Sequence, residues 1–269
     1  MWWSLYKKEW QESLFRFAVS LALLTAAYVF IYIFMERETP LVFAVSLAVV
    51  FLHIFYLFIM LLASLIKEWK ENTSHLWMNL PVKGYVLLSA KLAAAFTQFL
   101  ISISYAIVAA DLILQRAVRM FEDSAAEGLT GIISMLVPLF RELIPWVLLA
   151  VTNGALQLGI AAMFIFIFSK VVRPFGWLAA IVLTVLTNYI YTWIKNIPLI
   201  ERITEWTPLL KGEEIQEKIY SLYPGGAEIM DGSEGIVTNV YLGQIAAELL
   251  VLAGAFFLIS WLLDRKAEL

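Results

Sequence analysis

Hydrophobic residues gather into six long, nearly continuous runs along the chain. The runs cover residues 17–35, 41–66, 85–114, 145–169, 175–194 and 237–263. A transmembrane helix needs about 20 mostly apolar residues, and each run approaches or exceeds that length. Strands of a membrane barrel are about 10 residues long and alternate in polarity, whereas these runs are continuous. The pattern therefore predicts an all-α membrane protein with six transmembrane helices.

Composition agrees with this fold class. Of the 269 residues, 62% are hydrophobic and 15% are charged, against about 25% charged in an ordinary soluble domain. The chain has no Cys and only two His, which excludes disulfides, thiolate metal sites, catalytic thiols and a His-built metal cluster. His53, inside the second run, is expected to be a packed or hydrogen-bonded residue.

Basic residues indicate how the chain is oriented. If the N-terminus is cytoplasmic, 11 of the 19 Lys and Arg residues lie on the cytoplasmic side, together with 6 of the 22 Asp and Glu residues. Cytoplasmic connections of membrane proteins carry an excess of Lys and Arg. We therefore expect both termini to be cytoplasmic.

The first residues differ from the rest. In 1–16, Trp3, Tyr6 and Trp10 recur at helical spacing, with lysines elsewhere around the helix. Such a segment suits an amphipathic helix lying in the membrane interface, ahead of a six-helix domain over 17–269. Its role is either that of an ordinary Trp/Lys anchor or that of a gate or elbow helix. A cleaved signal peptide is disfavoured, because the polar part is long and the next run spans a bilayer.

The cytoplasmic connection 67–91 carries a hydrophobic element. Leu76, Trp77 and Leu80 supply an apolar face, and Pro81 ends the short helix that they predict. A short helix of this kind is typical of a docking element. The alternative is a loop folded onto its own helix ends.

Both long connections on the outer side are expected to hold short helices. In 115–144, the second half, 132–144, is apolar and predicts a surface helix leading to the fourth span. In 195–236, amphipathic stripes over 200–210 and 215–222 predict two short extracellular helices between the fifth and sixth spans.

Polar side chains inside the predicted spans need partners and often mark transport paths. The candidates for a translocation path are Gln98, Ser102, Asn153, Gln157, Asn188, Gln244 and Glu248. Helix packing and the lining of a transport path explain these polar side chains about equally well. On the fourth span, Ala150, Gly154, Ala155 and Gly159 permit close helix approach.

Among the polar residues within the predicted spans, Glu248 is the strongest indication of a specific role. A charge at mid-span costs roughly 3 kcal/mol on insertion scales, which the apolar residues of the same span offset. Either Glu248 is a hydrogen-bonded residue at a helix or subunit interface, or it lines or gates a transport path. A proton relay is disfavoured, because the sequence predicts no second acid at that depth.

Catalytic motifs are missing from the sequence. It has no GxxxxGK[ST] phosphate-binding loop, no HExxH and no GxSxG, and Asp111 is the only Asp within a predicted span. We therefore expect no enzyme activity, no metal site, no cofactor bound by this chain and no nucleic-acid partner.

The run Glu71, Leu80-Pro81-Val82 and Lys91 resembles the loop after the second span of ABC-2 type permeases, the membrane subunits of bacterial ATP-driven exporters. In that family an acidic residue precedes an LPV sequence and a Lys opens the third span. The motif covers about 20 residues, and the six-span plan extends the resemblance to the whole chain. The family often has Gly-Thr after the acidic residue, where this chain has Asn72-Thr73.

The resemblance implies a permease homodimer in the bacterial plasma membrane. Two ABC-type ATP-binding subunits would hold the ATP and Mg²⁺ and would contact the residues Glu71, Leu76, Trp77, Leu80 and Pro81. Cargo would be an amphipathic peptide, an antibiotic or a lipid-like molecule, exported between the two copies. The rival hypotheses are a secondary transporter or channel, a membrane enzyme, and a non-transporting immunity or assembly protein.

Overall fold

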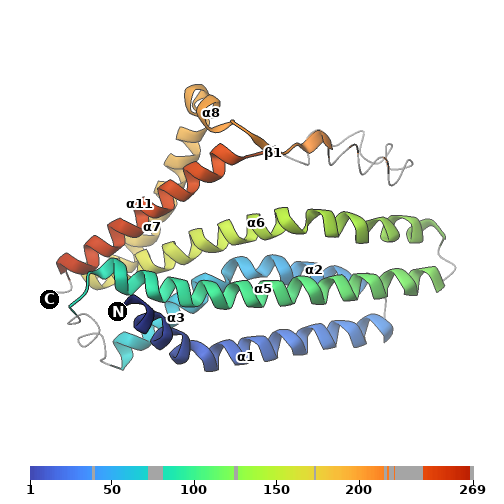
Figure 1. Ribbon diagram of the computed structural model, residues 1–269, viewed down its shortest axis with the longest axis horizontal. Helices are drawn as coiled ribbons and strands as arrows, with labels where there is room; N and C mark the ends of the chain where they lie inside the picture. The colour runs from blue at the N-terminus through green and yellow to red at the C-terminus, as the bar shows by residue number, and fades with distance from the viewer. Residues whose placement is uncertain are drawn as a thin grey trace.

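The computed structural model is built from long helices, most of them side by side (Figure 1). It describes residues 1–37, 40–71, 81–123, 127–172, 174–214, 217, 221 and 239–266. Within these residues, six helical segments are long and apolar enough to cross a membrane, as the sequence predicted.

The first span begins earlier than expected. Helix α1 (Trp2–Arg37) is one helix of 36 residues, so the predicted interfacial segment 1–16 is its N-terminal part rather than a separate helix. The chain has no Gly or Pro before Pro40 that would end a helix. Figure 1 shows the first turns of α1 at an angle to the rest.

The second span is interrupted. After the 3₁₀ turn η1 (Pro40–Val42), helix α2 (Phe43–Leu52) passes through the 3₁₀ turn η2 (His53–Phe55) into α3 (Tyr56–Lys70). His53 Nδ1 lies 2.9 Å from the Val49 carbonyl oxygen, and Nε2 lies 3.1 Å from Ser102 Oγ. His53 is therefore a packed, hydrogen-bonded residue, as expected.

The third and fourth spans form a hairpin much longer than predicted. Helix α5 (Gly84–Asp123) has 40 residues and α6 (Glu127–Val171) has 45, so the expected surface helix 132–144 is part of α6. At 1.5 Å per residue, α5 is about 60 Å long, about twice the thickness of a bilayer core. Arg141 joins the two helices by donating to Asp111 at 2.9 and 3.0 Å, which stabilises helix where the sequence predicted a loop.

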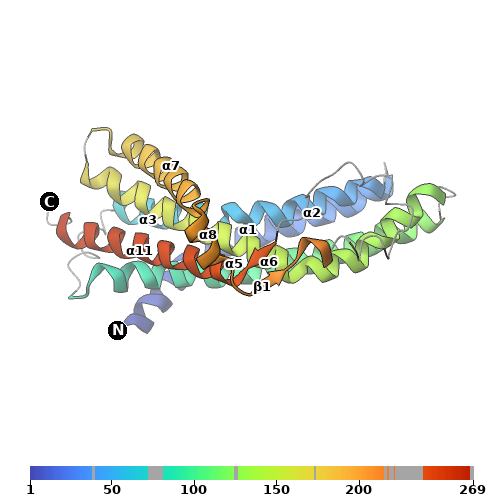
Figure 2. The same cartoon turned by 90° about the horizontal axis from the view of Figure 1, so that it is seen from above.

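The last two spans lean away from this bundle. Helix α7 (Gly176–Lys195) leads to α8 (Pro198–Thr204), and α11 (Leu242–Lys266) ends the described chain. Figure 1 shows α7 and α11 leaving α6 toward α8, and Figure 2 shows them approaching each other at α8.

The connection before α11 departs from the all-helical expectation. The stripe predicted over 200–210 is helical only to Thr204, and strand β1 (Pro208–Leu210) then pairs with β2 (Val240–Tyr241). Helix stops before Thr207, which takes a φ of 53°, in the left-handed region that residues other than glycine rarely adopt. The stripe predicted over 215–222 lies largely outside the described residues.

Close packing of α6 on α3 centres on small residues, as the sequence predicted. A Cβ on Gly159 would lie 3.0 Å from Leu57 Cβ and 3.0 Å from Leu61 Cδ1, so a side chain there has no room. Both leucines are fully buried. By contrast, a Cβ on Gly254, in α11, would meet no atom within 4 Å.

We predict that Gly159→Leu destabilises the protein by about 1–3 kcal/mol, since it overpacks a filled interface. Gly254→Leu, in open space, should leave stability unchanged or raise it slightly through helix propensity. Thermal unfolding in detergent, followed by size-exclusion chromatography, measures both. Equal midpoints for the two variants would contradict the packing of α6 on α3.

Candidate functional site

A buried ion network joins α1, α3 and α5 at the end of the bundle where the 67–91 connection leaves it. Lys91, in α5, is 2% exposed and donates to Glu9 Oε2 of α1 at 2.5 Å and to Ser64 Oγ of α3 at 2.7 Å. Its Nζ also lies 3.5 Å from Glu68 Oε1. Three helices distant in sequence therefore share one ammonium group.

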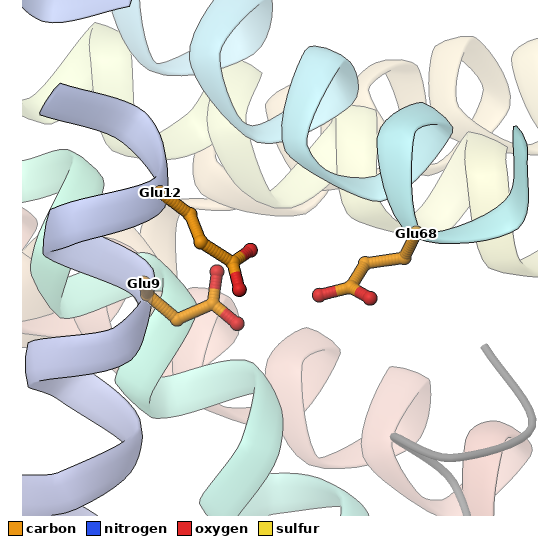
Figure 3. Close-up of side chains that lie close together, drawn as sticks. All are labelled: Glu9, Glu12 and Glu68. Atoms are coloured by element: carbon orange, nitrogen blue, oxygen red, sulfur yellow. The ribbon is translucent and has the colours of Figure 1, made fainter. Parts of the chain in front are cut away.

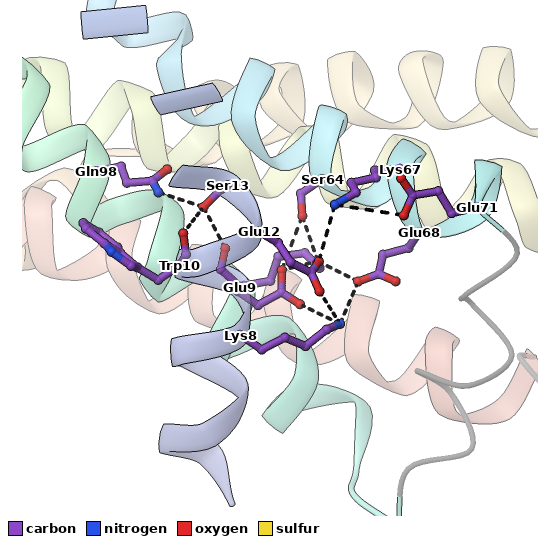
Figure 4. A network of polar contacts seen from close by, with 11 residues as sticks. Lys8, Glu9, Trp10, Glu12, Ser13, Ser64, Lys67, Glu68, Glu71 and Gln98 are labelled. Atoms are coloured by element: carbon purple, nitrogen blue, oxygen red, sulfur yellow. Dashed lines mark hydrogen bonds and ion pairs between the residues drawn. The ribbon is translucent and has the colours of Figure 1, made fainter. Parts of the chain in front are cut away.

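Exposed lysines complete the network (Figure 4). Lys8 lies 3.2 Å from Glu68 and 3.4 Å from Glu12, and Lys67 lies 3.9 Å from Glu12. Three lysines thus balance the carboxylates Glu9, Glu12 and Glu68. A buried carboxylate is tolerated only when it is paired in this way.

The same three carboxylates could be taken for a metal site. One oxygen from each of Glu9, Glu12 and Glu68 lies within 4.8 Å of the others, and Figure 3 shows them converging from α1 and α3. Their oxygens, however, already receive lysine ammonium groups at 2.5 to 3.9 Å. The donor set therefore fits an ion-pair network better than a divalent cation.

The network lies at both ends of the predicted docking segment. Glu68 lies at the start of the 67–91 connection and Lys91 at its end. Glu71 is the C-cap of α3, with its side chain 54% exposed and 4.0 Å from Lys67. Pro81 is exposed. The predicted coupling residues Leu76, Trp77 and Leu80 lie outside the described residues.

A second contact ties the start of α5 to the end of α11. The Gly84 backbone N–H donates to Asp264 Oδ1 at 2.6 Å, so a carboxylate from α11 caps the positive end of α5. A Cβ on Gly84 would lie 2.7 Å from the same oxygen and 3.0 Å from the Ser260 carbonyl oxygen, so the two helices approach closely at this glycine. The start of α5 is therefore bonded directly to the last turns of α11.

A cavity of about 510 Å³ lies among α6, α7 and α11. This volume is within the range of small-molecule sites, about 300–1,000 Å³. Its polar lining comprises Gln157, Thr184, Thr187, Asn188, Tyr191, Thr192, Lys195, Asn196 and Glu248. The predicted path residues Gln157, Asn188 and Glu248, from three different spans, are thus brought together.

Glu248 has partners on both sides of the cavity. The Asn153 side-chain amide of α6 donates to one carboxylate oxygen, and Lys195 Nζ of α7 lies 4.0 Å from the other. Asn153 Oδ1 is buried and has no hydrogen-bond partner among the described residues. Glu248 is therefore a bonded residue between helices that also faces a cavity, and its role in a transport path stays a prediction.

The remaining path candidates lie elsewhere. Gln98 and Ser102 are 0% and 2% exposed in the core, where Gln98 Nε2 donates to Ser13 Oγ at 2.7 Å and Ser102 meets His53. These two side chains therefore lie in the helix core, outside the lining of the cavity among α6, α7 and α11. Gln244 is half-buried one turn before Glu248 and is not among the cavity-lining residues.

Sequence reasoning missed the ion network. Glu9, Glu12 and Glu68 entered only as charges on the cytoplasmic side, and Lys91 only as part of the family motif. The local signals were two i,i+4 pairs: Lys8 Nζ lies 3.4 Å from Glu12 Oε1, and Lys67 Nζ lies 4.0 Å from Glu71 Oε2.

Comparisons with known proteins leave the family open. No protein-family profile matches the chain, and neither the curated proteins nor the solved structures provide a match.

We predict that Lys91→Met destabilises the protein by roughly 3–5 kcal/mol, because it removes the one buried ammonium group that pairs with Glu9 and Glu68 and leaves these buried carboxylates only the partly exposed Lys8 as a counter-charge among the described residues. Lys8→Met is the matched control: Lys8 contacts Glu68 too, but its side chain is 41% exposed, so about 1 kcal/mol or less is expected. Thermal unfolding in detergent measures both losses. Adding Glu9→Gln to Lys91→Met should recover part of the stability; a purely additive loss would contradict the pairing.

Proposed function

We propose that the chain is the permease subunit of an ATP-driven exporter. It would act as a homodimer, and each copy would bind one separate ABC-type ATP-binding subunit through the 67–91 segment. The observation that carries the proposal is the ion network around Lys91, which joins the two ends of that segment to α1. A push on the segment would then move α1, α3 and α5 together.

The charge network suits force transmission because its groups are buried. Lys91, Glu9 and Glu68 are each less than 5% exposed, so separating them would leave charges unpaired in a medium of low dielectric. Helices joined in this way move as one body. ATP-driven closure of the partner subunits would thus rock the bundle rather than bend one helix.

The contact between Gly84 and Asp264 connects the docking segment to the helix that lines the cavity. It joins the first residue of α5 to the last turns of α11, and α11 carries Glu248 into the cavity. Motion at the docking segment can therefore change the spacing of α6, α7 and α11. Since the sequence has no phosphate-binding loop of its own, ATP and Mg²⁺ would be held by the partner.

One observation favours a second candidate, a secondary transporter. Glu248 is an ionisable group in the cavity wall, with its side chain 19% exposed. Coupling to an ion gradient through Glu248 would need no ATPase. The two functions differ in what drives transport in sealed vesicles: ATP with a partner subunit, or a proton or ion gradient with this chain alone.

The proposal requires both termini and the 67–91 segment to be cytoplasmic. Since the chain has no Cys, single cysteines can be labelled without background. We predict that a membrane-impermeant maleimide added to intact cells labels Glu205→Cys and leaves Lys83→Cys unlabelled until the cells are opened. Both positions are exposed, and the opposite labelling pattern would overturn the orientation.

For coupling, we predict that Leu80→Asp with Glu71→Arg lowers the ATP hydrolysis that co-purifies with the chain by about tenfold or more, as loss of an interface hot spot does. The chain is isolated from its native membrane, the ATPase is identified by mass spectrometry, and hydrolysis is measured per mole of chain. The folded fraction is checked by size-exclusion chromatography.

The matched control carries the same chemical changes at α8 and β1, away from the 67–91 segment (Figure 1). Leu209→Asp with Glu205→Arg alters an exposed Leu within β1 and an exposed Glu at the end of α8, and it should retain the ATPase. Full hydrolysis by the variant with Leu80 and Glu71 replaced, or an equal loss in the control, would contradict docking through 67–91.

A further inference from the structure

The cavity among α6, α7 and α11 has two unlike ends. Lys195 and Asn196 lie at the last residues of α7 and Glu248 in the second turn of α11, so charge and amide groups gather at the end near α8. Further along α11 the lining is apolar, with Ala255, Leu258 and Ile259. Ten residues separate Glu248 from Leu258, about 15 Å along a helix. This shape fits a molecule with a polar head and an apolar tail.

The polar end carries one charge of each sign. Lys195 Nζ and Glu248 Oε1 are 4.0 Å apart, too far for a hydrogen bond, and their side chains are 33% and 19% exposed. A ligand with one charge would engage one of them and desolvate the other without compensation. A zwitterionic head would engage both, with its anion at Lys195 and its cation at Glu248.

The neutral groups around Glu248 favour a cation that donates hydrogen bonds. The amide side chains of Gln157, Asn188 and Asn196 line the same cavity, and each carries one oxygen that can accept a hydrogen bond. A primary ammonium has three N–H donors for such acceptors. A quaternary ammonium has none and prefers an aromatic cage, whereas Tyr191 is the one aromatic residue near the charged end of this lining.

The tail of such a ligand would lie where α7 and α11 meet the bilayer. Only 6% of the most apolar window of α7 and 11% of that of α11 are buried inside the chain. Leu178, Val182 and Leu258 are exposed apolar residues on these helices. The cavity between them therefore opens toward the acyl chains of the bilayer.

We propose that this cavity binds a zwitterionic phospholipid with a primary amine, of the phosphatidylethanolamine type. Its ammonium pairs with Glu248, its phosphate with Lys195, and its acyl chains follow Phe164, Ala255 and Leu258. As a statement about cargo, the inference rests on the proposed function; as a statement about binding, it stands on the cavity alone.

Binding is measured on the purified full-length chain in detergent, without any ATPase. Native mass spectrometry follows titration with short-chain phosphatidylethanolamine, phosphatidylcholine and phosphatidylglycerol, and with water-soluble phosphoethanolamine. We expect phosphatidylethanolamine to bind about tenfold more tightly than either of the other lipids, since each lacks one charged hydrogen-bonded contact. Phosphoethanolamine should bind weakly, because it has no tail.

Three variants test the assignment of each end. Glu248→Gln should lower phosphatidylethanolamine affinity about tenfold and leave phosphatidylglycerol affinity equal or higher. Lys195→Met should weaken the binding of both phosphatidylethanolamine and phosphatidylglycerol. Ala255→Phe, which keeps both charges and fills the apolar end, should weaken all three lipids. Glu201→Gln and Lys211→Met, in the same outer region but outside the cavity lining, are the matched controls and should bind as wild type does.

Several results would overturn the inference. They are equal binding of the three lipids to the wild type, unchanged head-group preference in Glu248→Gln, and phosphoethanolamine binding as tight as that of the lipid. If Glu248→Gln does not fold, lipid binding by Ala255→Phe and Lys195→Met tests the inference instead. Selective lipid binding by a chain that recruits no ATPase would refute the proposed function alone, whereas an ATPase-coupled chain without that selectivity would refute this inference alone.

Discussion

A lysine buried at the rim of a membrane protein must be neutralised by the chain itself, because neither water nor lipid will do so. Lys91 meets this constraint with Glu9 of α1 and with Glu68 and Ser64 of α3. These contacts fix how three helices meet at the end of the bundle. They also explain why α1 continues as one helix into the polar segment that the sequence assigned to the interface, since Glu9 must reach the core.

The ion network around Lys91 also connects parts of the molecule that would move during transport. The 67–91 connection begins and ends at the network, and the Gly84–Asp264 contact links the same place to α11. The packed helices α1, α3, α5 and α6 form the main bundle, whereas α7 and α11 lean away from α6 and approach each other at α8 (Figures 1 and 2). The cavity lies among α6, α7 and α11, so a displacement of α11 would change its distance from α7 and with it the width of the cavity.

The sequence predicted the six spans because length and apolarity are local properties that a bilayer demands of any helix. It could not predict the network, because its ion pairs join residues 60 and 82 positions apart. Nor could it separate Gln98 from Gln157: both are amides within an apolar span, and only tertiary packing places one in the core and the other in a cavity. The long α5–α6 hairpin was missed because its polar end is stabilised by a fork between Asp111 and Arg141, 30 residues apart.

The central claim is that ATP hydrolysis in a partner subunit moves α7 relative to α11. It is tested most directly by pulsed electron paramagnetic resonance between spin labels on Tyr189→Cys and Leu250→Cys, two exposed positions on these helices in a chain without native Cys. In the complex with its ATP-binding subunit, we expect a distance distribution that changes when ATP and Mg²⁺ are added, and no change for the chain alone. An unaltered distribution in a complex that hydrolyses ATP would contradict it.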